Sequence, residues 1–264
     1  MKIFISIVSH LHHDVIINLG TIKKLRNYAD VTVVCRDNVP ISKLRLYCEK
    51  YGAIYLPNSY RQGFAANNNN NFLYCQEKLG MQSTDLFLLL NPDVYISNDA
   101  IKQLLTKVSE QQPKLATCNL YLDREYMVQD DNIRIYPKFV NFIKTYLLND
   151  RSTMVNRESG LSVSVKHWAS CSFMLVEADL YQKLKGLDES YYMYCEDIDF
   201  FHRANLAGQS FSYMESIKAV HYRRRNSKRF LSKYFFWHVG SVFKYSFSKK
   251  KMQAKKSCLS RLNS

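Results

Sequence analysis

Acidic residues are absent from the last fifth of the chain. The 264 residues include 37 Lys plus Arg and 23 Asp plus Glu, a formal net charge of +14, yet nothing acidic follows Glu215. Fourteen of the basic residues lie in 216–264, so the first 215 residues are neutral, with 23 charges of each sign. Such an asymmetry indicates an anionic partner for the tail, either a lipid surface or nucleic acid.

The chain also lacks the patterns of a secreted or membrane-spanning protein. Its seven cysteines are odd in number and form no C-x-x-C pair, which excludes a disulfide framework and a zinc knuckle and fits a reducing compartment. No run reaches the roughly 18 apolar residues of a spanning helix. Residues 1–10 have no small-residue cleavage site and suit a first strand better than a signal peptide. We expect a cytoplasmic protein, soluble or bound to the membrane surface.

What is present is the composition of a globular α/β protein. Hydrophobic residues make up 47% of the chain, enough for a sizeable core. Apolar runs alternate with helix-like segments, and strands that are apolar along their length imply a mainly parallel sheet covered by helices on both faces. The expected strands are 3–8, 31–35, 53–56, 85–90 and 169–176, and the expected helices are 14–27, 41–51, one ending at Gly80, 177–184, and one from about 196 to Gly208.

Polar residues follow four strands of this predicted sheet, at the point where each strand ends. Ligands of such sheets bind beyond the carboxyl ends of the strands, so these residues should share one rim. In chain order they are Ser9 and His10, then Asp37 and Asn38, then Asn58 with the nearby Gly63, and finally Asn91 and Asp93.

A second concentration of carboxylates lies in 191–203. Glu196 and Asp197 would begin a helix, where the macrodipole stabilises anions and would keep a carboxylate ionised, the state required of a general base. Capping of the helix is the ordinary role of such residues. Tyr192 and Tyr194, just before them, favour an acceptor-binding wall, with core packing explaining part of the pattern.

These motifs together resemble a known family. The motif LLLNPDV (88–94), the strand SFMLV (172–176), the segment KGLDESYYMYCEDIDFFHRANLAG (185–208) and a terminal AVH (219–221) resemble the inverting family 2 glycosyltransferases with the GT-A fold, most of all the bacterial rhamnosyltransferases of surface polysaccharides. The resemblance covers roughly residues 1–222. It implies a Rossmann-like, mainly parallel sheet flanked by helices, and a nucleotide-sugar donor.

The resemblance also implies roles for individual residues. Asp197 matches the family's general base and Glu196 would orient the acceptor beside Tyr192 and Tyr194, while Asp199 would pair with Arg203, four residues on. Asp93 and His221 would hold a divalent metal, Mg²⁺ or Mn²⁺, against the donor diphosphate. The remaining donor-binding residues implied are Ser9, Asp37, Asn38, Gly63, Asn67 and Asn91.

The sequence departs from the family pattern at the metal motif, where Asn91-Pro92-Asp93 replaces the usual Asp-x-Asp and one carboxylate is missing. Taken alone, Asn-Pro-Asp is an ordinary turn signal. The asparagine run 67–71 is interpreted as a solvated loop and helix cap, with one member facing the donor. His10, His12 and His13 are interpreted as a polar loop because no carboxylate or cysteine completes a ligand set nearby.

The tail, 223–264, forms a basic, aromatic, amphipathic helix in this interpretation. The predicted lipid-facing stripe is Leu231, Tyr234, Phe235, Val239 or His238, Val242 and Tyr245, with lysines 249–251 meeting anionic lipid. The alternative is a helix that packs on the catalytic domain. The division predicted is therefore 1–222 as a GT-A domain, with a nucleotide-sugar-binding half 1–95 and an acceptor half 96–222, followed by the tail.

The function implied is transfer of L-rhamnose from dTDP-rhamnose, with inversion, onto polyprenyl-diphosphate-linked GlcNAc or a growing glycan in lipopolysaccharide O-antigen synthesis. It places the protein on the inner face of the cytoplasmic membrane. The alternatives are another GT-A hexosyltransferase, a nucleotidyltransferase, and a nucleic-acid-binding protein. A nucleotidyltransferase needs a glycine-rich loop after the first strand, and Ser9 to Asp14 contain no glycine. Nucleic-acid binding leaves the carboxylates unexplained, so no nucleic-acid partner is expected.

Overall fold

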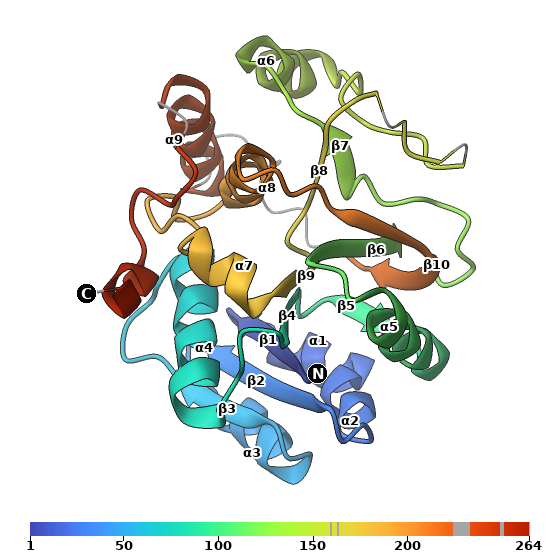
Figure 1. Cartoon of the computed structure of the whole chain (residues 1–264), viewed down its shortest axis with the longest axis vertical. Coiled ribbons are helices and arrows are strands. Elements are labelled where there is room, and N and C mark those ends of the chain that lie inside the picture. Colours follow the sequence, from blue (N-terminus) through green and yellow to red (C-terminus); the bar gives the residue numbers. More distant parts are fainter. Residues whose placement is uncertain (159, 163, 224–232, 249–250, 264) are drawn as a thin grey trace.

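The structure is a computed structural model that describes residues 1–158, 160–162, 164–223, 233–248 and 251–263. Within these residues, eight strands form one mixed sheet in the order β3-β2-β1-β4-β9-β6-β10-β5 (Figure 1). The strands are β1 (Ile3–Ser9), β2 (Val31–Asp37), β3 (Ile54–Pro57), β4 (Leu86–Leu90), β5 (Val94–Ile96), β6 (Leu115–Tyr121), β9 (Phe173–Glu177) and β10 (Ser212–His221). A separate two-stranded antiparallel sheet consists of β7 (Ile133–Ile135) and β8 (His167–Ala169).

The first half of the sheet is parallel, as the apolar runs predict. Strand β1 pairs in parallel with β2 and β4, and β2 with β3, whereas β9 runs antiparallel to β4 and β6. The parallel register aligns the carboxyl ends of β1, β2 and β3 at one rim, which confirms the mainly parallel α/β fold.

Helices cover both faces of this sheet. They are α1 (His13–Leu19), α2 (Thr21–Leu25), α3 (Ser42–Lys50), α4 (Phe64–Leu79), α5 (Asn98–Gln111), α6 (Phe139–Leu148), α7 (Ala178–Lys183), α8 (Glu196–Leu206), α9 (Lys233–Phe247) and the 3₁₀ helix η2 (Cys258–Asn263). One hydrophobic core gathers α4, α7 and α8 on one face, and a second core gathers α1, α2, α3 and α5 on the other (Figure 1). Burial of both faces explains why the central strands are apolar without alternation.

Two local predictions are wrong. The single helix expected over 14–27 is split into α1 and α2, because Gly20 adopts a left-handed conformation with φ 63° and ends the first. The asparagine run is not a solvated loop: it forms the first half of α4, which begins after Gly63 and ends as expected at Gly80. Four of its five asparagines are buried.

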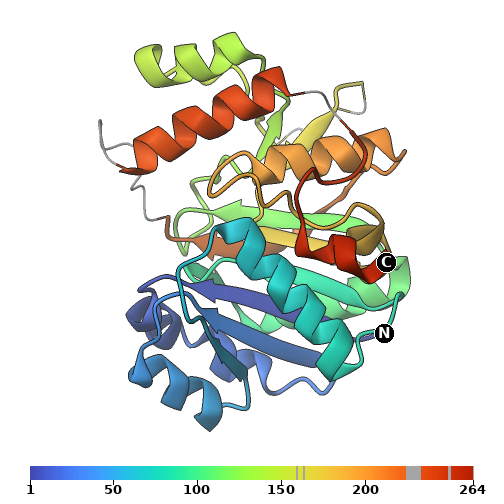
Figure 2. The same ribbon diagram turned by 90° about the vertical axis from the view of Figure 1, so that its left-hand side faces the viewer.

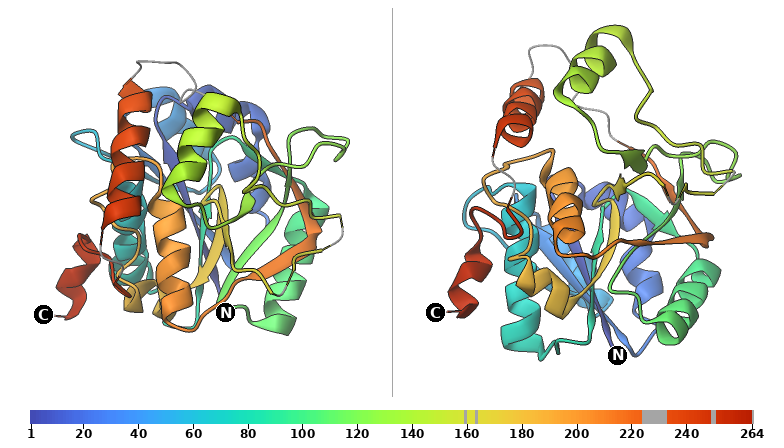
Figure 3. Two further views of the ribbon diagram at one scale, coloured as in Figure 1. Left: turned by 90° about the horizontal axis from the view of Figure 1, so that it is seen from above. Right: turned by 45° about the horizontal axis from the view of Figure 1, so that its top comes forward.

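Helices α6 and α9 lie side by side above the sheet (Figure 3). The Phe139 ring packs 5.2 Å from Phe243 and 5.1 Å from Phe247, centroid to centroid. The stripe predicted to meet lipid is wrong at Val242 and Tyr245, which are each only 6% exposed and pack on the body of the protein. Leu231 lies outside the described residues. The opposite side of the helix pair is exposed, and we call it the apolar two-helix face: Val140, Ile143, Leu147, Leu148, Phe236, Phe243 and Phe247.

Beyond α9 the chain returns to the body of the protein, where η2 lies against α4 (Figure 2). Leu259 is 1% exposed, and the Asn69 amide donates to Ser257 Oγ over 3.3 Å. The last described segment is therefore a packed element as well as a basic one. In the part of the chain that the structure describes, no helix has the length and apolar character needed to cross a bilayer.

Candidate active site

The predicted polar rim is assembled at the ends of β1, β2 and β3. The Asn38 backbone N–H donates to the Ser9 carbonyl over 2.8 Å, and the Asn58 N–H donates to the Asp37 carbonyl over 3.0 Å. All four residues are less than 9% exposed. Main-chain bonds thus place these side chains in one compact group, as expected from a parallel sheet.

Asp37 lies at the end of β2 and is fully buried. Its Oδ2 accepts from the Ile41 backbone N–H at 2.9 Å and from the Tyr55 hydroxyl at 3.0 Å. Its Oδ1 is also buried and has no hydrogen-bond partner among the described residues. A buried carboxylate oxygen without a donor is costly, so this atom suits a ligand N–H.

Side-chain amides complete the rim. Asn58 Nδ2 donates to Asn38 Oδ1 at 2.9 Å and to Asn67 Oδ1 at 2.6 Å, and Asn67 Nδ2 donates to the Gly63 carbonyl at 2.9 Å. This network ties the start of α4 to β2 and β3. Asn67 therefore reaches the rim as predicted, but its own amide is occupied by the protein.

The other buried asparagines of the run hold the fold. Asn71 donates to Ser6 Oγ at 2.8 Å, on strand β1. Asn69 accepts from the Tyr181 hydroxyl at 2.7 Å and donates to the Leu187 carbonyl at 2.8 Å. These bonds connect α4 to segments more than 60 residues away in either direction, so the run is a structural polar core.

Asp93 and His221 are brought together, as the resemblance implies. Strands β5 and β10 pair so that His221 lies opposite Val94, and Asp93 Oδ1 is 3.4 Å from His221 Nε2. Burial raises the pKa of Asp93, but the hydrogen bond and charge of His221 and the charge of His12 outweigh it, and the net shift is downward. Asp93 is thus held ionised.

Asp130 is a site residue that the sequence interpretation missed. Its Oδ2 lies 2.6 Å from His221 Nδ1, and Asp130 also pairs with Arg223. Asp130 is 2% exposed and comes from the weakly periodic segment between β6 and β7. No sequence signal connects it to His221, which is 91 residues away.

The loop that carries Asp93 and the start of α8 both contact the segment just before β9. The Asn91 backbone N–H donates to the Ser172 carbonyl at 2.9 Å, while the adjacent Cys171 backbone hydrogen-bonds the Asp197 carboxylate. The loop carrying Asp93 and the start of α8 therefore lie on either side of the same short segment.

Asp197 and Glu196 begin α8, as predicted, but their ionisation differs from expectation. Burial raises the pKa of Asp197 from 3.8 to about 6, although the Ile198 N–H and the charge of Arg134 act against the rise. Burial and the Asp197 charge raise the pKa of Glu196 well above its ordinary value. Desolvation outweighs the helix dipole here, which gives Asp197 a pKa suited to a general base near neutrality. Glu196 Oε2 is buried without a partner among the described residues.

Asp199 and Arg203 pair as predicted, with Oδ2 2.7 Å from Nε. Both side chains are buried. The Arg203 guanidinium also donates to the Leu184 and Gly186 carbonyls, at 2.7 and 2.9 Å. The pair therefore fixes the turn before the site to helix α8 and does not face a substrate.

The two tyrosines predicted to bind the acceptor, Tyr192 and Tyr194, precede α8 in a strained turn. Tyr194 and Cys195 both have positive φ, 71° and 66°, which is uncommon for such residues and aims the chain into the site. Tyr192 is 37% exposed and its ring lies 4.6 Å from that of Trp237 on α9. A Cβ on Gly63 would meet the Tyr192 carbonyl at 2.5 Å, so Gly63 is required for this close approach of the two halves.

Asp93 and His221 are too few ligands to hold a metal alone, so a substrate would have to complete its coordination. Asp93 Oδ1 and His221 Nε2 are two suitable donors, but no three His, Cys, Asp or Glu side chains gather into a metal site among the described residues. Mg²⁺ is commonly held by one or two carboxylates together with substrate phosphates. The residues thus fit a divalent cation bound jointly with a diphosphate.

Comparison with known proteins gives the family. The chain is 32% identical to the rhamnosyltransferase WbbL of Escherichia coli K12 over 248 residues, 92% of each protein. It is 26% identical to a low-salt glycan biosynthesis hexosyltransferase of Haloferax volcanii, over 87% of this chain and 70% of that protein. A segment of 62 residues, 24% of this chain and 20% of the relative, is 34% identical to an N-acetylglucosaminyl-diphospho-decaprenol L-rhamnosyltransferase of Mycobacterium tuberculosis. No family model matches the sequence.

Solved structures agree on the fold. The chain superposes with a TM-score of 0.58 on a Pyrobaculum calidifontis mannosyltransferase bound to GDP-Man and Mn²⁺, at 12% identity, covering 95% of this chain and 65% of that one. It superposes equally well on glucosyl-3-phosphoglycerate synthase of Mycobacterium tuberculosis bound to Mn²⁺, UDP and phosphoglyceric acid, at 10% identity over 94% and 79% of the two chains. The architecture is thus that of nucleotide-sugar glycosyltransferases.

Proposed function

The chain belongs to the rhamnosyltransferase-like family 2 glycosyltransferases of GT-A fold, and from this premise we propose that it transfers L-rhamnose from dTDP-rhamnose, with inversion, onto polyprenyl-diphosphate-linked GlcNAc or a growing glycan. The observation that carries the proposal is the meeting of Asp93 and His221 with the start of α8 across the Ser172 loop. Two of the relatives are rhamnosyltransferases, which supports the sugar, and the N-acetylglucosaminyl-diphospho-decaprenol L-rhamnosyltransferase among them supports the acceptor. Another hexose is the alternative, since one relative is a hexosyltransferase.

The donor nucleotide lies at the rim of β1, β2 and β3 in this proposal. Asp37 Oδ1, buried and without a protein donor among the described residues, accepts the base N–H, and the Ser9 and Asn38 end of the sheet holds the nucleoside. Asn91 and Asp93, at the end of β4, face the diphosphate. Both Gly63 and Asn67 act indirectly, by shaping this rim.

The chemical step is a single displacement. Asp197 takes the proton of an acceptor hydroxyl, the hydroxyl oxygen bonds to the anomeric carbon from the side opposite the diphosphate, and the bond from that carbon to the diphosphate oxygen breaks. Glu196 and the tyrosines Tyr192 and Tyr194 orient the acceptor sugar. Asp93 and His221 would hold a divalent cation, Mg²⁺ or Mn²⁺, whose charge would stabilise the departing diphosphate.

The protein works at the inner face of the cytoplasmic membrane in this account, because a polyprenyl-linked acceptor is confined there. The apolar two-helix face is the surface that meets the bilayer: it exposes Phe243 (51%) and Phe247 (69%) beside Leu147 (71%) and Leu148 (74%). An interfacial helix buries such a face in the headgroup boundary. The chain around α9 is basic and has no acidic residue after Glu215, which suits anionic lipid and distinguishes this surface from an ordinary protein contact.

Transfer assays test the proposed function. The protein is incubated with dTDP-rhamnose or other nucleotide sugars and a synthetic GlcNAc-diphosphate lipid, and the lipid product is measured. We expect a rhamnosylated lipid. Transfer of a different sugar would support a glycosyltransferase but exclude dTDP-rhamnose as its donor.

A further inference from the structure

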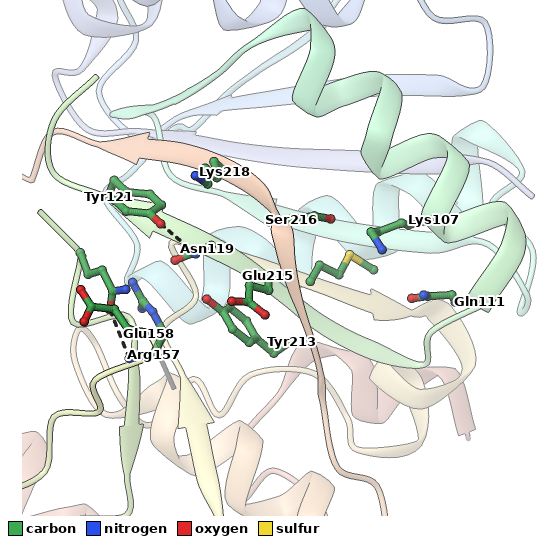
Figure 4. A pocket seen from close by; sticks show the side chains of 12 residues that line it. Lys107, Gln111, Asn119, Tyr121, Arg157, Glu158, Tyr213, Glu215, Ser216 and Lys218 are labelled. Atoms are coloured by element: carbon green, nitrogen blue, oxygen red, sulfur yellow. Dashed lines mark hydrogen bonds between the residues drawn. The ribbon is translucent and has the colours of Figure 1, made fainter. Parts of the chain in front are cut away.

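A cavity of about 650 Å³ lies apart from the proposed reaction site. Its walls come from α5, β6, β10 and the segment between β6 and β8, and include neither the carboxylates of α8 nor Asp93 and His221 (Figure 4). Seven of the residues around it carry the argument: Lys107, Asn119, Arg157, Glu158, Tyr213, Glu215 and Lys218.

The cavity exists because strand β10 leaves the sheet locally. Met214 lies opposite Cys118, and the next paired residue, Lys218, lies opposite Asn119. Three residues of β10, 215–217, therefore correspond to none on β6. Such bulges recur beside functional sites, and this one ends next to Asn119, which stays paired with Lys218 in the middle of the sheet.

Arg157 provides a buried donor at the cavity wall. The side chain is 1% exposed, its Nη1 donates to the Asp130 carbonyl at 2.7 Å and its Nη2 to the Leu120 carbonyl at 2.9 Å. Its Nε is buried and has no hydrogen-bond partner in the described chain. The guanidinium therefore retains one N–H for a bound group, and leaving it unused is costly.

Asn119 and Tyr213 provide the complementary groups. Asn119 is 4% exposed; its Nδ2 donates to the Tyr121 hydroxyl at 3.1 Å, while its Oδ1 is a buried acceptor that no described residue satisfies. The Tyr213 hydroxyl is buried and similarly lacks a partner in the described residues. The wall thus combines a donor, an acceptor and a hydroxyl that can serve as either.

We propose that this cavity is a second binding site, for one or two neutral sugar residues. The diphosphate of a nucleotide sugar can accept from Arg157 but has no proton to donate to Asn119 Oδ1, whereas neighbouring sugar hydroxyls both accept and donate. The cationic residues Lys107, Arg157 and Lys218 are nearly balanced by Glu158 and Glu215, which favours a neutral ligand. The volume lies within the range of small-molecule sites, and the Tyr213 ring offers an apolar wall to a sugar face.

Ligand-observed NMR on the full chain tests the site, with methyl α-L-rhamnoside and N-acetylglucosamine as probes and inorganic phosphate as the anionic comparison. We expect saccharide binding to weaken about tenfold or more in Tyr213→Phe and in Asn119→Leu, since each removes a hydrogen bond to a buried group. Tyr213→Phe deletes one partnerless oxygen and keeps the ring, so the fold is retained even where Asn119→Leu fails to fold. The matched control is Tyr47→Phe, because the Tyr47 hydroxyl on α3 is also buried but lies outside the cavity.

Unchanged saccharide binding in Tyr213→Phe would overturn the proposal. So would binding of phosphate with no binding of either sugar, or equal loss in Tyr213→Phe and Tyr47→Phe. Because binding is measured without a donor or turnover, a failure here leaves the proposed transfer reaction standing, and failure of the transfer assay leaves the cavity result standing.

Discussion

Asp130 Oδ2 lies 2.6 Å from His221 Nδ1, and both side chains are nearly enclosed. A carboxylate against one ring nitrogen fixes which nitrogen carries the proton and how the ring is oriented. The other nitrogen, Nε2, is thereby presented to Asp93. The structure thus reveals a supporting residue for Asp93 and His221, the pair proposed to hold the metal, that the sequence did not indicate.

Asp130→Asn should therefore weaken metal and donor binding. Loss of such a supporting carboxylate typically lowers metal affinity by about 10- to 100-fold, and we expect the Mn²⁺ concentration needed for half-maximal transfer to rise by that factor. The matched control is Asp131→Asn, which removes the neighbouring ion pairs with Arg151 and Arg223 and leaves His221 untouched. Equal effects of both variants would show that Asp130 acts only through general stability.

Asp197→Asn should lower turnover by roughly two to four orders of magnitude, the loss expected when a general base is removed, and leave nucleotide binding unchanged in calorimetry. Asp99→Asn is the matched control, because Asp99 is an exposed carboxylate in the first turn of α5. It reports what removal of a helix-terminal charge alone does. An Asp197→Asn enzyme of full activity would contradict the assignment.

The pH dependence of the same residue has a definite sign. With a folded-state pKa of about 6, the base is lost by protonation below pH 6, and the transfer rate should fall about tenfold per pH unit there. Because this pKa lies above the ordinary 3.8, ionised Asp197 opposes folding, so its contribution to stability improves as pH falls from 6 towards 4. Asp197→Asn should therefore melt at a higher temperature than the parent at pH 7.5, with the difference vanishing near pH 4. A lower melting temperature at pH 7.5 would contradict the raised pKa.

Asn69→Ala should destabilise the protein by about 2 kcal/mol or more, because it leaves several buried partners unsatisfied. These partners include the Tyr181 hydroxyl and the Leu187 backbone. Asn70→Ala is the neighbouring control, since the Asn70 amide contacts only Gln62 and Ala66 among its hydrogen-bond partners in the described residues. Urea unfolding measures the free energy of unfolding of both variants. An equal loss in both would contradict a structural role for Asn69 and support the solvated loop expected from the sequence.

The pair Phe243→Asp and Phe247→Asp should reduce sedimentation with vesicles that contain anionic lipid. Burial of one phenylalanine side chain contributes about 1.5–3 kcal/mol, so each substitution should weaken binding about tenfold or more, while circular dichroism stays unchanged. Leu46→Asp is the control, because Leu46 is 59% exposed on α3 and lies away from the two-helix face. Vesicle binding that is unaffected by both phenylalanine variants would show that this face does not meet lipid.

The rim could be predicted from sequence because parallel pairing forces it. Apolar strands ending in polar residues leave little choice about where Ser9, Asp37 and Asp93 lie, and the carboxylates of α8 follow from a local helix start. Asp130 could not be predicted in this way, since its partner His221 is 91 residues distant and the segment around it has no period.

The tail shows a different limit. Helix α9 is apolar on both sides, so the spacing of its apolar residues does not say which side packs on the protein. In the structure Val242 and Tyr245 face the protein. The prediction of a solvated loop for the asparagine run was wrong for a related reason. Amides are buried only where partners exist, and Ser6, Tyr181 and Ser257 are supplied by distant parts of the chain.

The central claim is transfer of rhamnose by the Asp93 and Asp197 centre, and one measurement addresses it directly. Purified protein, dTDP-rhamnose with a label on the sugar, Mn²⁺ and a GlcNAc-diphosphate lipid are combined, and the label in the lipid is followed for the parent and for Asp197→Asn. The account predicts labelled lipid from the parent, with the new linkage inverted at the anomeric carbon, and a loss of at least a hundredfold in the variant. Absence of labelled lipid from the parent, or equal transfer by both proteins, would contradict it.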